Sequence, residues 1–289
     1  MKALIPYIHS KHADIELLFA LRCLDEHVKD VDGVVIVGDR PDFLNDSVQV
    51  LDFKQEGVKD YAIAKKVEYA FNESDSSKFF FMNDDHFFTK DCESESYPYY
   101  HRGDLYKENE REGYNRYQNM TKFYLNSIGY DSTDFDVHCP IVYEREKFLE
   151  LSEHWQKEKS FLVKSMYCNI HGIKGKEYKD CKLRQLKGER DFEKAFRNEC
   201  FSIYDYALKG GAIKWLASNY PNRSRYENDC DFRFVTEKPY REKRTGFFMD
   251  KWAESIVGNE RAMEMLSTGL EYVRLDGYVN DPDLKNLKA

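Results

Sequence analysis

The sequence predicts an α/β fold with an open, mostly parallel sheet flanked by helices and followed by a helical C-terminal extension. Over the first 90 residues, short and almost wholly apolar segments alternate with segments of helical periodicity. This alternation is typical of parallel strands that are buried on both faces. Polar residues follow each apolar segment directly, at the edge where open α/β sheets bind ligands.

The expected elements follow in order from the N-terminus. Strands are predicted over residues 3–7, 33–38, 48–53 and 79–82. Helices are predicted over residues 15–28, with Asp14 as the N-cap, and over residues 60–72. The order β-α-β-β-α-β indicates the nucleotide-binding half of a Rossmann-type, doubly wound sheet. The chain has neither G-x-G-x-x-G nor G-x-x-x-x-G-K-[ST], so a dinucleotide fold or a P-loop ATPase is not expected.

The rest of the chain is less regular. Residues 89–118 form a long segment rich in Tyr and charged residues, either a functional lid or acceptor loop, or a solvated surface excursion. Helices are predicted over residues 119–128, 144–157 and 160–171. A strand interrupted by Pro140 is predicted over 135–143, at an edge or bulge position. Residues 1–188 are expected to form the first domain, and residues 189–289 a mostly helical extension packed on it, ending in a helix over 258–269.

Composition narrows the class of protein. The net charge of −8 argues against non-specific binding to nucleic acid, although a local basic groove is compatible with it. The seven cysteines are irregularly spaced and include no C-x-x-C pair, so reduced thiols in a cytoplasmic protein are expected. No apolar run is long enough to span a bilayer, and the N-terminus does not read as a signal peptide.

The strongest functional signal is the end of the predicted strand 79–82, where Asn83, Asp84 and Asp85 follow four apolar residues. Two adjacent carboxylates beside an apolar wall repel each other and are costly to desolvate. A divalent cation relieves both problems, and Mn²⁺ or Mg²⁺ suits such oxygen ligands. The alternative is a polar turn in which one of the two acids caps a helix.

Residues 79–88, Phe-Phe-Phe-Met-Asn-Asp-Asp-His-Phe-Phe, resemble the hydrophobic-Asn-Asp-Asp-x-Phe-Phe signature of the Stealth family of sugar-phosphate transferases. They are also similar to the acidic motif of GT-A glycosyltransferases, and the general layout resembles that of phage-encoded sugar transferases. His138-Cys139-Pro140, leading into a helix, is similar to the His-x-Pro segment of the Stealth family. That family's Asp-Gly-Ser-Asp run is replaced here by residues 7–12, which favours plain glycosyl transfer.

The resemblance implies a GT-A-like catalytic domain over residues 1–188 that binds a nucleotide-sugar. It implies that Asp84 and Asp85 hold the metal and the donor diphosphate, and that His138 is a further metal ligand or an acceptor-side group. From the sequence alone, His138 can equally be a structural side chain. Asp134 and Asp136, just before His138, are candidates for the general base by position alone, and any acid in residues 89–118 competes with them. The candidate catalytic residues are Asp85, Asp136 and His138.

The donor pocket is expected at the ends of the first strands. Tyr7 and His9 follow the first strand and Asp39 follows the second, where such folds meet the base or ribose. Lys65 and Lys66, on the second predicted helix, could both reach phosphates, although a solvated lysine is the ordinary alternative, and Lys65 is the one included in the site. With Asp84, these residues are the expected cofactor-binding set.

The leading hypothesis is a metal-dependent glycosyltransferase that moves a sugar from a nucleotide-sugar, expected to be a UDP-sugar, to a hydroxyl of a larger acceptor. The acceptor is a glycan or a hydroxymethylated pyrimidine in phage DNA; the DNA alternative uses basic segments at residues 187–197, 223–226 and 238–244. Other hypotheses are a Stealth-type sugar-1-phosphate transferase, a non-catalytic nucleotide-sugar-binding module and a metal-dependent nuclease. A cytoplasmic location in a bacterium or a phage-infected host is expected, and the sequence indicates no oligomeric state.

Overall fold

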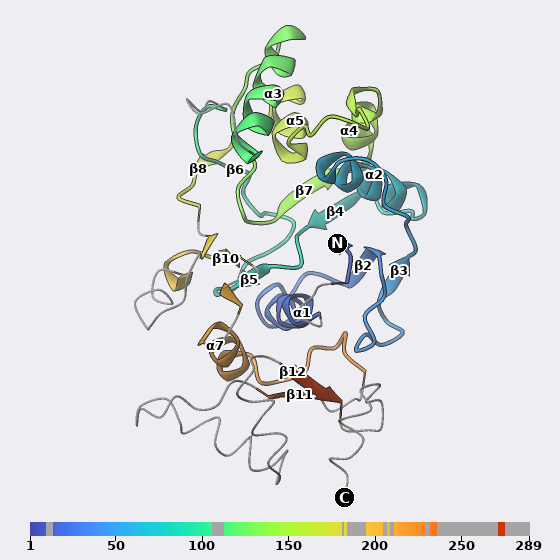
Figure 1. The fold of residues 1–289 in the computed structure, drawn as a ribbon, viewed down its shortest axis with the longest axis vertical. Coiled ribbons are helices and arrows are strands. Elements are labelled where there is room, and N and C mark those ends of the chain that lie inside the picture. Colours follow the sequence, from blue (N-terminus) through green and yellow to red (C-terminus); the bar gives the residue numbers. More distant parts are fainter. Residues whose placement is uncertain are drawn as a thin grey trace, which may run out of the picture.

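The computed structural model describes residues 1–9, 14–105, 113–180, 182–183, 195–204, 207–208 and 211–228, together with the strands at residues 232–235 and 271–274. A five-stranded sheet lies at its centre (Figure 1). The sheet consists of β1 (Lys2–Tyr7), β2 (Gly33–Gly38), β3 (Gln49–Leu51), β4 (Lys78–Phe81) and β7 (Ile141–Glu144), in the order β3-β2-β1-β4-β7. The first four strands pair in parallel, and β7 runs antiparallel to β4. The predicted mostly parallel α/β sheet is therefore confirmed.

Helices cover both faces of this sheet (Figure 1). Helix α1 (Ile15–His27) packs on one face, and α2 (Lys59–Asn72), α4 (Arg145–Leu149) and α5 (Val163–Ile170) pack on the other. Side chains alternate between the faces of a strand, so Ala3 and Ile5 of β1 join the core beside α1, whereas Leu4 joins the core beside α2. Burial on both faces explains why these strands are apolar throughout.

Helix α1 is more deeply buried than its predicted amphipathic pattern indicates. Every residue from Ile15 to Leu24 is buried. Besides the sheet, the segment at residues 220–227 contacts this helix. The buried Glu227 carboxylate accepts hydrogen bonds from Arg22 Nε at 2.9 Å and Nη2 at 2.7 Å. The predicted side-chain cap is wrong. Asp14 occupies the N-cap position without a capping hydrogen bond, because its carboxylate accepts a hydrogen bond from the Tyr7 hydroxyl.

A second, three-stranded sheet begins directly after the acidic motif. It consists of β5 (His86–Phe88), β10 (Cys200–Ile203) and β9 (Lys182–Leu183), in the order β5-β10-β9. Strand β10 runs antiparallel to β5 and parallel to β9. Ser202 pairs with His86 on one side and with Lys182 on the other, so three distant segments of the chain meet beside residues 83–85.

The region predicted to be irregular holds a short strand and the start of a helix. Strand β6 (Tyr100–His101) pairs in parallel with β8 (Lys176–Glu177). Helix α3 (Gly113–Ser127) begins six residues before the predicted helix start at 119. The helix predicted over 144–157 is only α4 followed by a 3₁₀ turn (Glu150–His154), and α5 begins three residues later than predicted.

The strand predicted over 135–143 is also shorter than expected. Residues 135–140 form a loop, and β7 begins at Ile141, directly after Pro140. Proline has no backbone N–H to donate to a strand ladder, so the ladder starts only after it. As predicted, β7 lies at the edge of the sheet. Asp136 and His138 therefore project from a loop rather than from a strand.

The predicted helical character of residues 189–289 is not confirmed. In the part of this region that the structure describes, helix α7 (Gly211–Asn219) is accompanied by β10 and by the antiparallel pair β11 (Phe232–Val235) and β12 (Glu271–Arg274). Strand β10 belongs to the sheet that contains β5. The helix predicted over 258–269 and the basic segment at 238–244 lie outside the described residues.

Candidate active site

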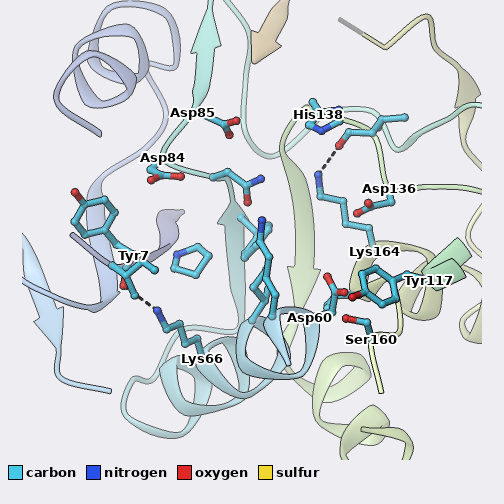
Figure 2. A pocket seen from close by; sticks show the side chains of 18 of the residues that line it. Tyr7, Asp60, Lys66, Asp84, Asp85, Tyr117, Asp136, His138, Ser160 and Lys164 are labelled. Carbon is cyan, nitrogen blue, oxygen red and sulfur yellow. Dashed lines mark hydrogen bonds between the residues drawn. The ribbon is translucent and has the colours of Figure 1, made fainter. Parts of the chain in front are cut away.

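A cavity of about 750 Å³ opens at the carboxyl ends of the central strands. Strand order reverses between β1 and β4, which is the topological switch point where open α/β sheets bind ligands. Figure 2 shows side chains converging on this cavity from the ends of these strands, from α2 and from the loop before β7. Of the predicted site residues, the structure brings six to its lining: Tyr7, His9, Asp84, Asp85, Asp136 and His138.

The two acids of the motif lie side by side at the end of β4 (Figure 2). Burial and then the charge of Asp85 raise the pKa of Asp84 to about 7. Burial alone would raise the pKa of Asp85 as well, but Lys182 and a hydrogen bond from Ser202 hold it well below its usual range. At neutral pH the pair therefore carries one firmly ionised carboxylate and one that is easily protonated.

The second sheet supplies the partners of Asp85. Ser202 Oγ donates a hydrogen bond to Asp85 Oδ2 at 2.6 Å, and Lys182 Nζ lies 3.1 Å from the same oxygen. The other oxygen, Asp85 Oδ1, is buried and has no hydrogen-bond partner among the described residues. The sequence did not indicate Ser202 or Lys182 as site residues, because no pattern among their neighbours connects them with the acidic motif.

The side of the cavity beside β1 and β2 is built around Tyr7. Lys66 Nζ donates a hydrogen bond to the Tyr7 carbonyl at 2.8 Å (Figure 2). Gly38 permits this close packing, because its φ is +131° and a Cβ there would lie 1.9 Å from the same carbonyl oxygen. The backbone N–H of His9 donates to Asp39 Oδ2 at 2.7 Å, which ties the ends of β1 and β2 together.

Two predicted donor-side residues are not among the described residues that line the cavity. Asp39 is engaged by His9 instead. Lys65 pairs with the buried Glu68 at 2.6 Å on α2, and its neighbour Lys66 lines the cavity. Lys65 and Lys66 lie on different sides of the helix because successive helical residues point about 100° apart. The sequence indicated the helix correctly but not which lysine faces the site.

The opposite side of the cavity carries Asp136 and His138 on the loop before β7 (Figure 2). The Asp136 carboxylate accepts a hydrogen bond from the Tyr114 hydroxyl at 2.5 Å. His138 is held by Asp180: its ring Nδ1 lies 2.6 Å from Asp180 Oδ2, and its backbone N–H donates to Asp180 Oδ1 at 2.9 Å. Asp180 belongs to no recognisable motif, so the sequence did not indicate it as a site residue.

Lys164 of α5 fixes the backbone of this loop. Its Nζ donates hydrogen bonds to the carbonyls of Val137 and Cys139, both at 2.7 Å, one on each side of His138. The lysine is itself buried. A buried ammonium is stable only where its donors are satisfied, and here the two carbonyls serve that purpose. Lys164 is thus a structural clamp, which places the His138 ring against the cavity.

Asp60, in the first turn of α2, is a further cavity residue that the sequence did not reveal. Burial raises its pKa to about 6, against a hydrogen bond with Ser160 that lowers it; the charge of Asp136 also raises it. Asp60, Ser160 and Tyr117 lie together in Figure 2 at the end of the cavity away from Asp84. Carboxylate, hydroxyl and aromatic groups together suit a polyhydroxylated ligand.

The acidic pair fits a divalent cation only in part. Asp85 Oδ1 is a buried oxygen without a partner among the described residues, and the mutual repulsion that raises the pKa of Asp84 is what a cation removes. However, the described part of the chain holds no group of three or more His, Cys, Asp or Glu side chains placed to bind one ion. Asp84, Asp85 and His138 are therefore not a ready-made three-ligand set, and an ion here would need phosphate or water oxygens as further ligands.

No protein-family model matches the chain, and no curated protein is significantly similar to it. Within the described residues, no helix combines the length and the apolar character that a membrane span requires.

Proposed function

We propose that this protein is a metal-dependent glycosyltransferase of GT-A type, which moves a sugar from a nucleotide-sugar to a hydroxyl of a larger acceptor. One observation carries the proposal: an acidic pair stands at the end of β4, at the switch point of a parallel sheet, and one of its buried carboxylate oxygens has no partner among the described residues. The cavity around it, about 750 Å³, is of the size that binds nucleotide-sized ligands.

In this proposal the donor and the acceptor bind on different sides of the cavity. The donor nucleotide would bind beside Tyr7 and His9 at the end of β1, with its diphosphate directed towards Asp84 and Asp85. A Mn²⁺ or Mg²⁺ ion on this pair would offset the charge that develops on the departing diphosphate. Lys182, 3.1 Å from Asp85, adds a fixed positive charge at the same place. The acceptor would enter from the side of Asp60, Asp136 and His138.

Of the three basic segments considered for DNA binding, only the one at residues 223–226 lies wholly within the described residues, and it bears on the class of acceptor. Arg225, in one of the basic segments considered for DNA binding, pairs with Asp25 at 3.0 Å and donates to the Val31 carbonyl at 2.7 Å. Its guanidinium is thus committed to structure, which favours a glycan acceptor over modified DNA. Salt-insensitive transfer to the acceptor would agree with this preference, because binding to DNA weakens steeply with salt.

The test is a thermal-shift titration with UDP and a panel of UDP-sugars, with and without Mn²⁺. A ligand that binds only the native protein raises its melting temperature by mass action. We expect a metal-dependent increase for the wild type, and its loss in Asp85→Asn. Asp91→Asn is the matched control, because Asp91 is an exposed carboxylate paired with His27. If no nucleotide or nucleotide-sugar shifts the wild-type transition in either condition, the proposal fails.

The released nucleotide separates the alternatives. A glycosyltransferase releases the nucleoside diphosphate, whereas a sugar-1-phosphate transferase releases the monophosphate. Metal-dependent binding without turnover of any donor would instead indicate a non-catalytic nucleotide-sugar-binding module.

A further inference from the structure

His138 and Asp180 are joined by two hydrogen bonds at the edge of the cavity. His138 Nδ1 lies 2.6 Å from Asp180 Oδ2, and Asp180 Oδ1 accepts the His138 backbone N–H at 2.9 Å. The His138 side chain is 26% exposed and that of Asp180 13% exposed. The ring is therefore open to a ligand, while the carboxylate behind it is largely enclosed.

The protonation of this pair follows from the environment of Asp180. Arg102 Nη1 lies 3.3 Å from Asp180 Oδ2. Burial alone would raise the pKa of Asp180, but the hydrogen bonds from His138 and the nearby guanidinium lower it overall. An ionised carboxylate can only accept hydrogen bonds, so the proton of a neutral His138 must reside on Nδ1. Nε2 is then the nitrogen that carries the lone pair.

The backbone around His138 is fixed at three points, by Lys164 at the carbonyls on either side and by Asp180 at the His138 N–H. Lys164 holds the carbonyls of Val137 and Cys139, on either side of the histidine. Arg102 anchors Asp180, and it also binds Asp134 at 2.7 Å. A histidine whose Nδ1, backbone and flanking carbonyls are all engaged has little freedom to turn, which is the arrangement of an oriented proton acceptor.

We propose that His138 is the catalytic base of the transfer, with Nε2 as the proton-accepting atom, and that Asp180 is its positioning residue. The inference rests on the proposed function and assigns its proton transfer. The acceptor hydroxyl gives its proton to Nε2 as its oxygen forms a bond with the anomeric carbon. The bond between that carbon and the diphosphate oxygen breaks, and its electron pair leaves with the nucleoside diphosphate. Asp180 stabilises the imidazolium that results.

Asp136 is the competing candidate for the base, and its contacts make it less suitable. The Tyr114 hydroxyl donates to Asp136 Oδ2 at 2.5 Å, and Arg102 Nη2 donates to that hydroxyl at 2.7 Å. Asp136 Oδ2 therefore already has a hydrogen-bond donor, whereas His138 Nε2 is the ring nitrogen that keeps a lone pair for the acceptor. Direct attack by an activated hydroxyl also inverts the configuration at the anomeric carbon, so inversion is expected.

The experiment uses the full chain, with UDP and Mn²⁺ as the binding probe. Turnover is measured as UDP release from the UDP-sugar that the wild type hydrolyses fastest, with water as the acceptor. We expect His138→Gln and Asp180→Asn each to lower kcat on the order of 10²-fold while the donor KM stays unchanged. Asp91→Asn, which breaks the equivalent contact of 2.9 Å with His27 outside the cavity, should leave kcat unchanged.

A second measurement does not depend on turnover. In protein labelled with ¹⁵N-histidine, the nuclear magnetic resonance signals of His138 should show a protonated Nδ1 in the wild type and a redistributed tautomer in Asp180→Asn. Wild-type kcat in both site variants, loss of kcat in Asp136→Asn alone, or a product of retained configuration would overturn the assignment of the base. Failure of UDP to bind the wild type would instead overturn the proposed function, which keeps the two failures distinct.

Discussion

Lys182 Nζ lies 3.1 Å from Asp85 Oδ2, so the positive charge beside the acidic motif comes from a residue 97 positions later in the chain. Strand β9 carries this lysine, and its pairing with β10 sets its position. The contact offsets the charge of one member of this buried pair of carboxylates. It also means that a divalent cation and Lys182 act on the same carboxylate.

Removal of this charge should strengthen cation binding. In Lys182→Met, the lysine no longer competes for Asp85, so Mn²⁺ should bind the nucleotide-free protein more tightly than it binds the wild type. Isothermal titration calorimetry with Mn²⁺ measures the effect. Lys157→Met is the control, because Lys157 forms an exposed pair with Glu56 at 2.7 Å. Unchanged or weaker Mn²⁺ binding in Lys182→Met would show that the two cations do not compete.

Asp84 should make stability fall as pH rises. Its pKa of about 7 in the folded protein lies above the ordinary value of 3.8, so the folded protein binds more protons than the unfolded chain between these limits. The stability contributed by this group is complete below about pH 4 and is lost as pH rises towards 7. Asp84→Asn should therefore be more stable than the wild type at pH 8, by about 4 kcal/mol.

Urea unfolding in the presence of a chelator, at pH 5 and at pH 8, provides the comparison. The gain from Asp84→Asn should be larger at pH 8 than at pH 5. Asp46→Asn, a change at a fully exposed acid, should show no such difference. An equal gain from Asp84→Asn at both pH values would contradict the expected ionisation.

The buried Arg22–Glu227 pair should hold residues 220–227 against α1. The side chains are 5% and 0% exposed, and Arg22 Nη1 also donates to the Tyr220 carbonyl at 3.1 Å. Glu227→Gln leaves the guanidinium without its counter-charge, so it should lower the free energy of unfolding by about 3–5 kcal/mol. Asp46→Asn, which breaks the exposed pair with Arg40, should change it by less than about 1 kcal/mol. Equal effects would show that the buried pair is not an anchor.

Lys164→Met should disturb turnover more than nucleotide binding. The change leaves the carbonyls of Val137 and Cys139 without their donor, which frees the loop that carries His138. We expect kcat to fall while the UDP-induced thermal shift remains. The variant should also be less stable, by about 1–3 kcal/mol for each buried group left unsatisfied. Lys147→Met, at a lysine 41% exposed, is the control. A variant that loses UDP binding but keeps kcat would contradict this role for the loop.

The first half of the fold was predictable because its signals are local. The strand at 33–38 was predicted with its observed bounds, and the helix at 60–72 begins one residue earlier in the structure. The alternation of apolar strands with helices also determines that β1, β2 and β4 place their carboxyl ends together. Tyr7 and Asp84 could therefore be assigned to one cavity before any coordinates.

The errors arose where a local pattern met a tertiary constraint. Asp14 is a residue type that often caps helices, but its carboxylate accepts a hydrogen bond from the Tyr7 hydroxyl instead. The sequence predicts a strand from residue 135, but Pro140 has no N–H to donate, and the strand begins only at Ile141. Lys65 and Lys66 are equivalent in a sequence pattern, and only the packing of α2 on the sheet decides that Lys66 reaches Tyr7.

By itself, the sequence determined the parallel sheet, the edge at which the cavity lies and the acidic pair at the end of β4, because strand and helix periodicities are properties of neighbouring residues. Only the tertiary structure decided which groups meet that pair and face it across the cavity. Ser202, Lys182 and Asp180 reach the site through short strands and loops separated by 42 to 117 residues from their partners. Such contacts depend on strand pairing and loop closure between distant segments, and no local pattern of residues encodes them.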